Sequence, residues 1–188
     1  MLELVKDKKN INLIVALGNF GREYLTTRHN TGFLFADRFT DYLQNQGFIA
    51  DEDSDKLFHV TVFKEQDLQI LKPLTMMNNS GKAVSEYLKY HVPGIFKPSI
   101  LLVHDDLDIK LGEYKLQYKH SPKNHNGVIS VEQEMSSNDF YRLRIGIDNR
   151  DLQTRPYGID YVLSRFEDEE LRQIYRIFDR IIQLEFKI

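Results

Sequence analysis

Cysteine is absent from this chain of 188 residues. Its absence excludes a disulfide framework, a thiolate metal site and a thiol nucleophile, and it suits a reducing compartment. Long apolar runs are absent as well, since none approaches the roughly 20 residues of a membrane-spanning helix. Residues 1–10 mix charges of both signs and lack the apolar core of a signal peptide. We therefore expect a cytoplasmic protein that makes no contact with membranes.

A surplus of positive charge is also missing, because the formal net charge is −3 at pH 7. Binding to nucleic acid phosphates requires clustered positive charge, so the distribution of charge matters more than its sum. Four lysines and one glutamate lie between Lys110 and Lys123, and arginines follow from Arg142 onward. On charge alone, an ordinary mixed surface and a face for nucleic acid stay equally open.

An apolar content of 41% with 28% charged residues is typical of a globular protein, and one domain is the default at this length. We interpret residues 1–10 as a short N-terminal extension and residues 11–188 as one domain. Apolar runs or period-two alternation predict strands at residues 11–17, 57–63, 68–71, 100–103, 113–118 and 140–147.

Helical spacing predicts helices that begin near residues 30, 80, 128 and 168. Asn30 or Thr31 is expected to cap the first of these helices, and Gly47 to end it. Residues 51–56 are interpreted as a polar loop, whereas residues 158–166 fit neither periodicity. Strands interleaved with helices predict the α/β class, as a single globular domain with a twisted mixed β-sheet flanked by helices.

Five polar loops beside these strands carry asparagine, histidine or aspartate without an apolar role. They are Gly18-Asn19, Arg28-His29-Asn30, Met76-Met77-Asn78-Asn79, His104-Asp105-Asp106 and Asn124-His125-Asn126-Gly127. Any one of them is readily explained as a turn, since asparagine and aspartate bond their own backbone. The recurrence of the same residue types across five loops favours a shared site, because α/β proteins place their chemistry beyond the ends of strands.

Other chemistries are open on the residues alone. Asp105, Asp106 and Asp108 follow a strand and could hold Mg²⁺ in a metal-dependent phosphoesterase. A dinucleotide-binding loop at residues 18–21 is disfavoured, because Ala16 stands where the first glycine of that motif is required. A serine nucleophile of the Gly-x-Ser-x-Gly type has no counterpart in the chain.

Seven segments, in their sequences and in their order along the chain, resemble the bacterial-type peptidyl-tRNA hydrolases. The matching segments are residues 17–21 with Tyr24, 27–33, 72–81, 104–108, 125–127, 140–147 and 159–166. The resemblance implies a cofactor-free, metal-independent esterase that cleaves the bond between a peptide and the 3′-terminal ribose of tRNA. It also implies a monomer that contacts the 3′ end and the acceptor-stem phosphates of peptidyl-tRNA.

By this resemblance, residues 11–188 form the catalytic domain and three residues carry the chemistry. His29 takes a proton from the attacking water, Asp105 orients the imidazole, and Asn19 contacts the peptide end. These roles suit the side chains, because neutral imidazole is a good base near pH 7 and a carboxylate fixes its tautomer. The positions implied in binding the ester or tRNA are Tyr24, Met76, Asn78, Asn126 and Arg144.

The chain also departs from the family pattern. The family's glycine-rich loop corresponds to residues 118–124, which contain no glycine, and Gln117 replaces a lysine of the phosphate clamp. Lys115 and Lys119 flank that position, and we take Lys115 as the substitute. Met76 replaces a customary aromatic residue, and Phe20 stands where proline is common.

These departures leave a catalytically idle RNA-binding relative as the alternative function. The retained pair of His29 and Asp105 argues against it, because a pure binder needs no base with an orienting carboxylate. We interpret His104 and His125 as structural residues.

Overall fold

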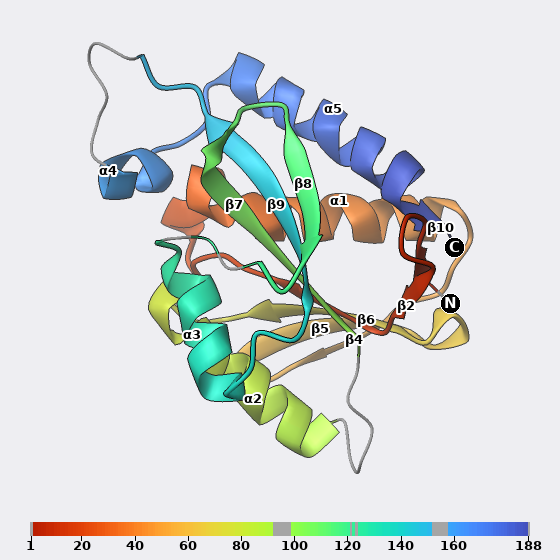
Figure 1. The fold of residues 1–188 in the computed structure, drawn as a ribbon. Helices are drawn as coiled ribbons and strands as arrows, with labels where there is room; N and C mark the ends of the chain where they lie inside the picture. The colour runs from red at the N-terminus through yellow and green to blue at the C-terminus, as the bar shows by residue number, and fades with distance from the viewer. Residues whose placement is uncertain (1, 92–98, 121, 123, 152–157, 188) are drawn as a thin grey trace.

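The computed structural model describes residues 2–91, 99–120, 122, 124–151 and 158–187 (Figure 1). Its main sheet has seven strands in the order β4-β5-β6-β3-β7-β9-β8. The four parallel strands are β6 (Leu68–Pro73), β3 (Leu13–Ala16), β7 (Ile100–Lys110) and β9 (Tyr141–Asp148). The antiparallel strands are β4 (Asp51–Ser54), β5 (Phe58–Phe63) and β8 (Tyr114–Tyr118). The sheet is therefore mixed.

Helices cover both faces of this sheet (Figure 1). Helices α1 (Thr31–Asn45) and α5 (Asp168–Glu185) pack over one face, together with Ile14 and Val103. Helices α2 (Ser80–His91) and α3 (Asn126–Met135) pack over the other, against Val15 and Leu102. Successive side chains of β3 and β7 thus point into different cores, which confirms the predicted mixed sheet flanked by helices. No helix in the described ranges is long and apolar enough to cross a membrane.

Two segments differ from their sequence interpretation. Residues 51–54, expected to lie in a loop, form the edge strand β4, whose four side chains are all exposed. An edge strand with both faces in water carries no apolar alternation, so its sequence gives no strand signal. Residues 158–166, which fitted neither periodicity, begin with the short helix α4 (Gly158–Leu163).

The N-terminal residues, interpreted as an extension, form part of a second sheet. Its three strands are β1 (Leu2–Leu4), β2 (Lys9–Ile11) and β10 (Phe186–Lys187), with β1 in the centre. Leu2 and Leu4 are fully buried against the core that α1 and α5 share. Because β10 lies at the opposite end of the chain from β1, no local sequence pattern predicts that these two strands pair.

Strand β7 is longer than the apolar run that predicts it. It continues through His104, Asp105 and Asp106 because β9 pairs with each of them in register; the register shifts after Asp106, and Lys110 pairs with Asp148. The polar residues therefore sit on a rigid, buried strand and not in a loop, with Asp105 and Asp106 on opposite faces. Within the loop that lacks glycine, residues 121 and 123 lie outside the described part of the chain.

Candidate active site

Gly32 allows the start of α1 to lie directly against the carboxyl end of β3 and against Val103 of β7. A Cβ atom at this position would come within 2.4 Å of the Leu17 carbonyl oxygen and 2.6 Å of the Val103 carbonyl oxygen. Only glycine permits so close an approach of helix to sheet. The 3₁₀ turn η2 (Arg28–Asn30), just before α1, therefore holds His29 beside Asp105 of β7.

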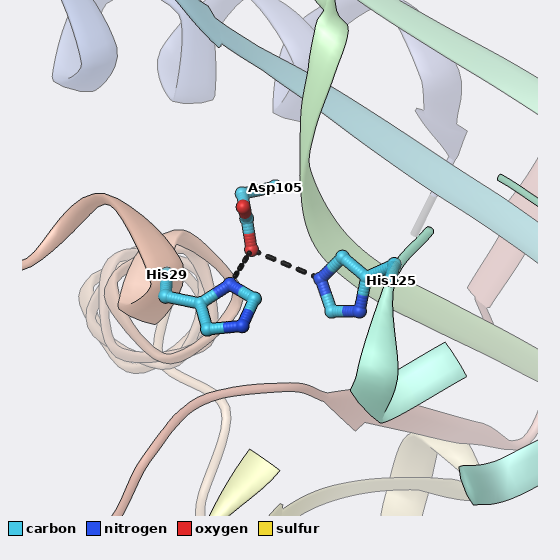
Figure 2. Close-up of side chains that lie close together, drawn as sticks. All are labelled: His29, Asp105 and His125. Atoms are coloured by element: carbon cyan, nitrogen blue, oxygen red, sulfur yellow. Dashed lines mark hydrogen bonds and ion pairs between the residues drawn. The ribbon is translucent and has the colours of Figure 1, made fainter. Parts of the chain in front are cut away.

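Two histidines share one oxygen of Asp105 (Figure 2). His29 Nδ1 lies 2.8 Å from Asp105 Oδ1, and His125 Nε2 lies 3.0 Å from the same oxygen. All three side chains are buried. A carboxylate accepts hydrogen bonds only, so Nδ1 of His29 carries a proton. When the ring is neutral, its Nε2 is therefore unprotonated, and this atom points away from Asp105 (Figure 2).

The second histidine is held in one tautomer. The backbone N–H of Val128 donates to His125 Nδ1 at 3.3 Å, so the proton of a neutral His125 ring sits on Nε2 and is directed at Asp105. This contact also caps helix α3, for which His125 is the N-cap residue. Behind it, His104 is fully buried and donates from Nδ1 to the backbone carbonyl of Asp105 at 2.7 Å.

The charges of this cluster follow from burial and contact. Burial by itself lowers the pKa of His29, but the charge of Asp105 and its hydrogen bond outweigh burial and raise this pKa above the ordinary 6.5. Burial raises the pKa of Asp105, yet the two imidazoles shift it well below the usual range. Burial lowers the pKa of His104 strongly. Asp105 is therefore a carboxylate at neutral pH, next to a neutral His104.

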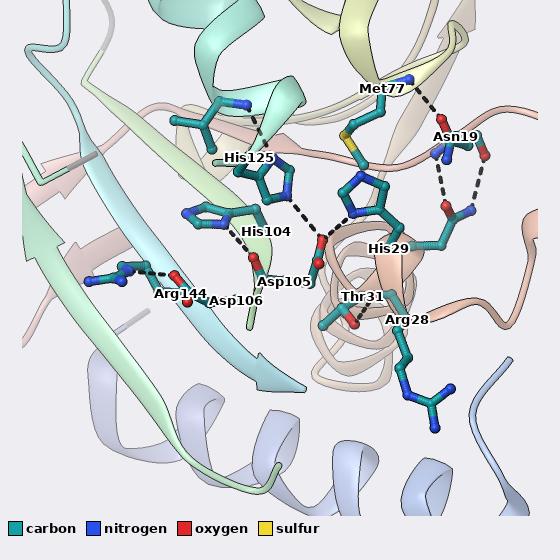
Figure 3. Close-up of polar contacts among 12 residues, drawn as sticks. Asn19, Arg28, His29, Thr31, Met77, His104, Asp105, Asp106, His125 and Arg144 are labelled. Carbon is teal, nitrogen blue, oxygen red and sulfur yellow. Dashed lines mark hydrogen bonds and ion pairs between the residues drawn. The ribbon is translucent and has the colours of Figure 1, made fainter. Parts of the chain in front are cut away.

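Three hydrogen bonds to two neighbouring residues hold Asn19 in place (Figure 3). Its backbone N–H donates to Asn30 Oδ1 at 2.8 Å, and Asn30 Nδ2 donates to its carbonyl at 3.0 Å. The backbone N–H of Met77 donates to Asn19 Oδ1 at 2.7 Å. The side-chain amide of Asn19 is thereby left with its N–H groups for a ligand. Asn30, expected to cap α1, uses its side chain on Asn19 and makes no cap hydrogen bond.

A cavity of about 620 Å³ opens in front of His29. This volume is in the range of small-ligand sites. On one side it is lined by the predicted residues Asn19, His29, Met76, Asn78, Asp105 and Asn126. On another side α4 contributes Ile159, Val162 and Leu163. The cavity thus joins a polar region rich in amide groups to an apolar wall.

Three predicted residues do not line this cavity. Tyr24 is half-buried in the turn η1 (Arg22–Tyr24), and Lys115 is exposed on β8, paired in register with Arg144. Arg144 is buried and donates from Nε to Asp106 at 2.7 Å (Figure 3). It also donates from Nη1 to Gln117 at 2.6 Å. Gln117 is thus a hydrogen-bond partner of Arg144.

His125, interpreted from the sequence as a structural residue, is the member of the buried cluster whose contact with Asp105 the sequence interpretation did not predict. It stands directly before Asn126 in one of the five polar loops, and that neighbourhood was its only signal. Its bond to Asp105 joins residues 20 positions apart, from a helix start to a strand, so no local pattern reveals it.

The Mg²⁺ hypothesis does not match the geometry. Asp105 is occupied by the two histidines, whereas Asp106, on the other face of β7, binds Arg144 and the backbone N–H of Asp108. In the described part of the chain, a group that could hold a metal is His29, Asp105 and His125, whose ligand atoms lie within 4.8 Å. A metal there would have to displace both protons that the imidazoles direct at Asp105.

Comparison with known proteins gives a consistent result. The family model described as "Peptidyl-tRNA hydrolase" matches residues 13–185. The peptidyl-tRNA hydrolase of Mycoplasma mycoides subsp. mycoides is 32% identical over 94% of this chain and 90% of its own length. That of Geotalea daltonii is 37% identical over 93% and 87%. A crystal structure of the Acinetobacter baumannii enzyme superposes with a TM-score of 0.77 at 30% identity, covering 93% of this chain and 86% of its own. The chain therefore belongs to the peptidyl-tRNA hydrolase family.

Proposed function

We propose that His29 activates the water molecule that cleaves the ester bond between a peptide and the 3′-terminal ribose of tRNA. The reaction follows from the family: the chain is a peptidyl-tRNA hydrolase, a carboxylic ester hydrolase. The mechanism rests on one observation, the 2.8 Å contact between His29 Nδ1 and Asp105. This contact leaves Nε2 of the neutral ring unprotonated at the edge of the cavity.

In the proposed mechanism, Nε2 of His29 takes a proton from water as the water oxygen adds to the ester carbonyl. The resulting imidazolium is stabilised by Asp105, which stays ionised. When the tetrahedral intermediate collapses, the bond to the ribose oxygen breaks and His29 returns the proton to that oxygen. Free tRNA and the peptide carboxyl group are the products, and the base is restored.

The amide groups of the cavity suit the remaining contacts. Asn19, Asn78 and Asn126 line the cavity. In the proposal, Asn19 donates to the peptide end, and Asn78 and Asn126 hold the ester, the water and the terminal adenosine. We assign the peptide to the apolar side formed by α4, and the 3′ end of tRNA to the side of Met76 and Tyr24.

Lys115 and Arg144 are the proposed contacts to acceptor-stem phosphates. Lys115 is exposed, whereas Arg144 would have to exchange part of its bonding to Asp106 for a phosphate. Replacing Lys115 with alanine is expected to lower the slope of log affinity against log salt concentration by about one, the value for one phosphate contact. An unchanged slope would remove Lys115 from the tRNA interface.

We also propose that the enzyme acts as a monomer in the cytoplasm, where ribosomes generate its substrate. One chain supplies both the base and its orienting carboxylate, so catalysis needs no second copy. Sedimentation at the enzyme concentrations of the assay tests this, and activity confined to a dimer fraction would contradict it.

The deciding experiment measures release of N-acetyl-aminoacyl groups from tRNA, with unblocked aminoacyl-tRNA as the specificity control. His29→Ala should lose about 10²–10⁴-fold in kcat and still bind tRNA, because it removes only the base. His59→Ala is the matched control, since His59 of β5 bonds Ser54 of the edge strand β4 and does not line the cavity. Equal turnover by His29→Ala and the wild type would disprove the mechanism.

Two further arms separate the alternatives. Excess EDTA should leave activity intact, whereas its loss would favour a metal-dependent hydrolase at His29, Asp105 and His125. Tight tRNA binding without any ester cleavage by the wild type would identify an idle RNA-binding relative.

A further inference from the structure

We propose that Arg28 is a positioning residue: it holds the α4 wall of the cavity close to the proposed base and thereby sets the affinity for the peptide. This inference rests on the proposed function, which assigns the peptide to the α4 wall. Arg28 precedes His29 in the turn η2, but its side chain points the opposite way, out of the cavity (Figure 3). One turn of backbone therefore carries both the base and a buried guanidinium.

The guanidinium of Arg28 binds the segment that leaves α4. Nη1 donates to Ser164 Oγ at 2.7 Å and to the Arg165 carbonyl at 2.6 Å. Nη2 donates to Glu170 Oε2 at 2.5 Å, in the first turn of α5. These charge-assisted bonds join η2 to residues more than 130 positions away, so they fix tertiary placement and not local structure.

Backbone contacts run alongside these bonds. The N–H of Arg28 donates to the Ser164 carbonyl at 3.0 Å, and the N–H of Phe166 donates to the Thr26 carbonyl at 3.0 Å. Thr27 and Arg165 form an isolated antiparallel bridge. Residues 164–166, which follow α4, are thereby paired with residues 26–28, which lead into η2. The side chain of Arg28 adds hydrogen bonds to this backbone pairing.

Arg28 also contacts α4 itself through an aromatic ring. Its guanidinium carbon lies 4.3 Å from the ring centre of Tyr161 and 5.2 Å from that of Phe166. The Tyr161 hydroxyl donates to the Ile147 carbonyl at 2.9 Å, which anchors the ring to β9. A cation near two aromatic rings at a buried site contributes attraction beyond its hydrogen bonds. Helix α4 therefore packs on the Arg28 guanidinium through the ring of Tyr161.

The carboxylate partner of Arg28 has little freedom of its own. Glu170 Oε2 also accepts from the backbone N–H of Glu167, completing the capping box of α5, and Oε1 accepts from Asn149 Nδ2 at 3.3 Å. Burial raises the pKa of Glu170, but the bond from Arg28 and the other donors lower it overall. Arg28 is thus tied to the fixed start of a long helix.

The opposite side of α4 faces the cavity. Ile159, Val162 and Leu163 line it, and Ile159 and Leu163 are 64% and 41% exposed. Exposed apolar side chains at the rim of a cavity are typical of a surface that a ligand covers. Since Arg28 holds α4 from behind and adjoins His29 in the chain, it sets the distance between this wall and the base.

The test is Arg28→Lys, which keeps the charge and loses the planar fork that reaches three acceptors. For N-acetylphenylalanyl-tRNA we expect KM to rise about tenfold, the effect of one lost charge-assisted hydrogen bond. We expect kcat to change less than about twofold and the acidic midpoint of the pH profile to stay in place, because Asp105 is untouched. N-acetylglycyl-tRNA, which offers α4 little apolar surface, should show a smaller rise in KM.

Two variants and one direct readout complete the experiment. Ser164→Ala removes a single acceptor and should act in the same direction with a smaller effect. Arg38→Lys is the matched control, because Arg38 ties α1 to Asp179 of α5 through two similar bonds and does not line the cavity. Hydrogen exchange of the α4 amides should accelerate in Arg28→Lys and not in Arg38→Lys.

Three results would overturn the proposal: an unchanged KM in Arg28→Lys, an equal rise for the glycyl and phenylalanyl substrates, or a fall in kcat with a shifted pH midpoint. If the wild type released no acyl group at all, the proposed function would fail instead. Binding of a 3′-amide-linked N-acetylphenylalanyl adenosine by the wild type and Arg28→Lys, together with α4 exchange, would still decide the role of Arg28.

Discussion

At the residue scale, one residue, Asp105, binds three histidines that have different surroundings. Asp105 Oδ1 accepts from His29 and His125, and the Asp105 carbonyl accepts from His104. The second ring nitrogen has a different environment in His29 and in His125. That of His29 faces the cavity, whereas that of His125 accepts a hydrogen bond from the backbone of α3. The surroundings of the second nitrogen therefore decide which histidine can act as a base.

Replacing Asp105 with asparagine should alter both the rate and the pH dependence. In the wild type the pKa of His29 is raised above 6.5, so activity rises with pH through a midpoint above that value, as the base loses its proton. Without the Asp105 charge, burial is left to lower this pKa, so the midpoint should move below 6.5. The plateau should fall about 10²–10⁴-fold, because the tautomer is no longer fixed.

The measurement is kcat/KM for an N-acetyl-aminoacyl-tRNA across the titration range of histidine. Asp179→Asn is the control, because Asp179 lies on α5 and binds Arg38 at the surface. A midpoint that stays in place in Asp105→Asn would mean that another group limits the acidic side of the profile.

At the element scale, the approach of α1 to the sheet decides whether the base and its partner meet. The helix starts at Thr31, directly after η2, and Gly32 lies against the carboxyl end of β3 and against Val103 of β7. His29 and Asp105 belong to different elements, so their 2.8 Å contact depends on this packing and on nothing local. An error in helix placement of even an ångström would break the pair.

Gly32→Ala should therefore damage stability and catalysis together. The added Cβ would meet carbonyl oxygens 2.4 and 2.6 Å away, and backbone atoms of two central strands cannot yield easily. We expect a loss of about 3 kcal/mol in unfolding free energy, the upper end for overpacking, with a drop in kcat as His29 shifts. Urea unfolding and single-turnover kinetics measure the two effects.

Gly47→Ala provides the comparison at the other end of α1. Gly47 has open space around it but a φ of +90°, so alanine there is strained without touching the site. It should cost about 1 kcal/mol and leave kcat unchanged. If both variants lost stability with kcat intact, the packing of α1 would not control the geometry of the base.

At the scale of the whole molecule, the two ends of the chain close a second small sheet. Strand β1 pairs with β2 and with β10, and its buried leucines join the core beneath α1 and α5. Strand β2 leads into the amino end of β3 and β10 ends the described chain, whereas the proposed base His29 follows the carboxyl end of β3 and Asp105 lies within β7. Stability at the termini and chemistry at the cavity are therefore spatially separate.

Leu4→Ala should destabilise the protein without altering the chemistry of the folded enzyme. Leu4 has no exposed surface, and removal of a buried leucine side chain costs about 2–5 kcal/mol. Val5→Ala, at a residue that is 48% exposed, should cost far less. Thermal unfolding ranks the variants, and kcat at low temperature should match the wild type in both. A fall in kcat for folded Leu4→Ala would link the terminal sheet to the site.

The elements that the sequence predicts correctly share one physical property: their signal is local in the chain. Helix α1, the hairpin of β5 and β6, and the apolar strands β3 and β7 follow from the period of their apolar residues, which is a local property. The candidate base, its carboxylate and the three asparagines followed from the resemblance to a family and lie at one cavity. Local pattern and motif order were sufficient for these.

What the sequence by itself determined is therefore the central strands and the main helices, the family, and most of the candidate residues that line the cavity. Only the tertiary structure decided that His125 shares Asp105, that Arg144 is buried against Asp106, and that Arg28 reaches Glu170. It also decided the pairing of β1 with β10. Each of these contacts joins segments remote in the chain, and its energy depends on burial and hydrogen-bond geometry that no local run of residues encodes.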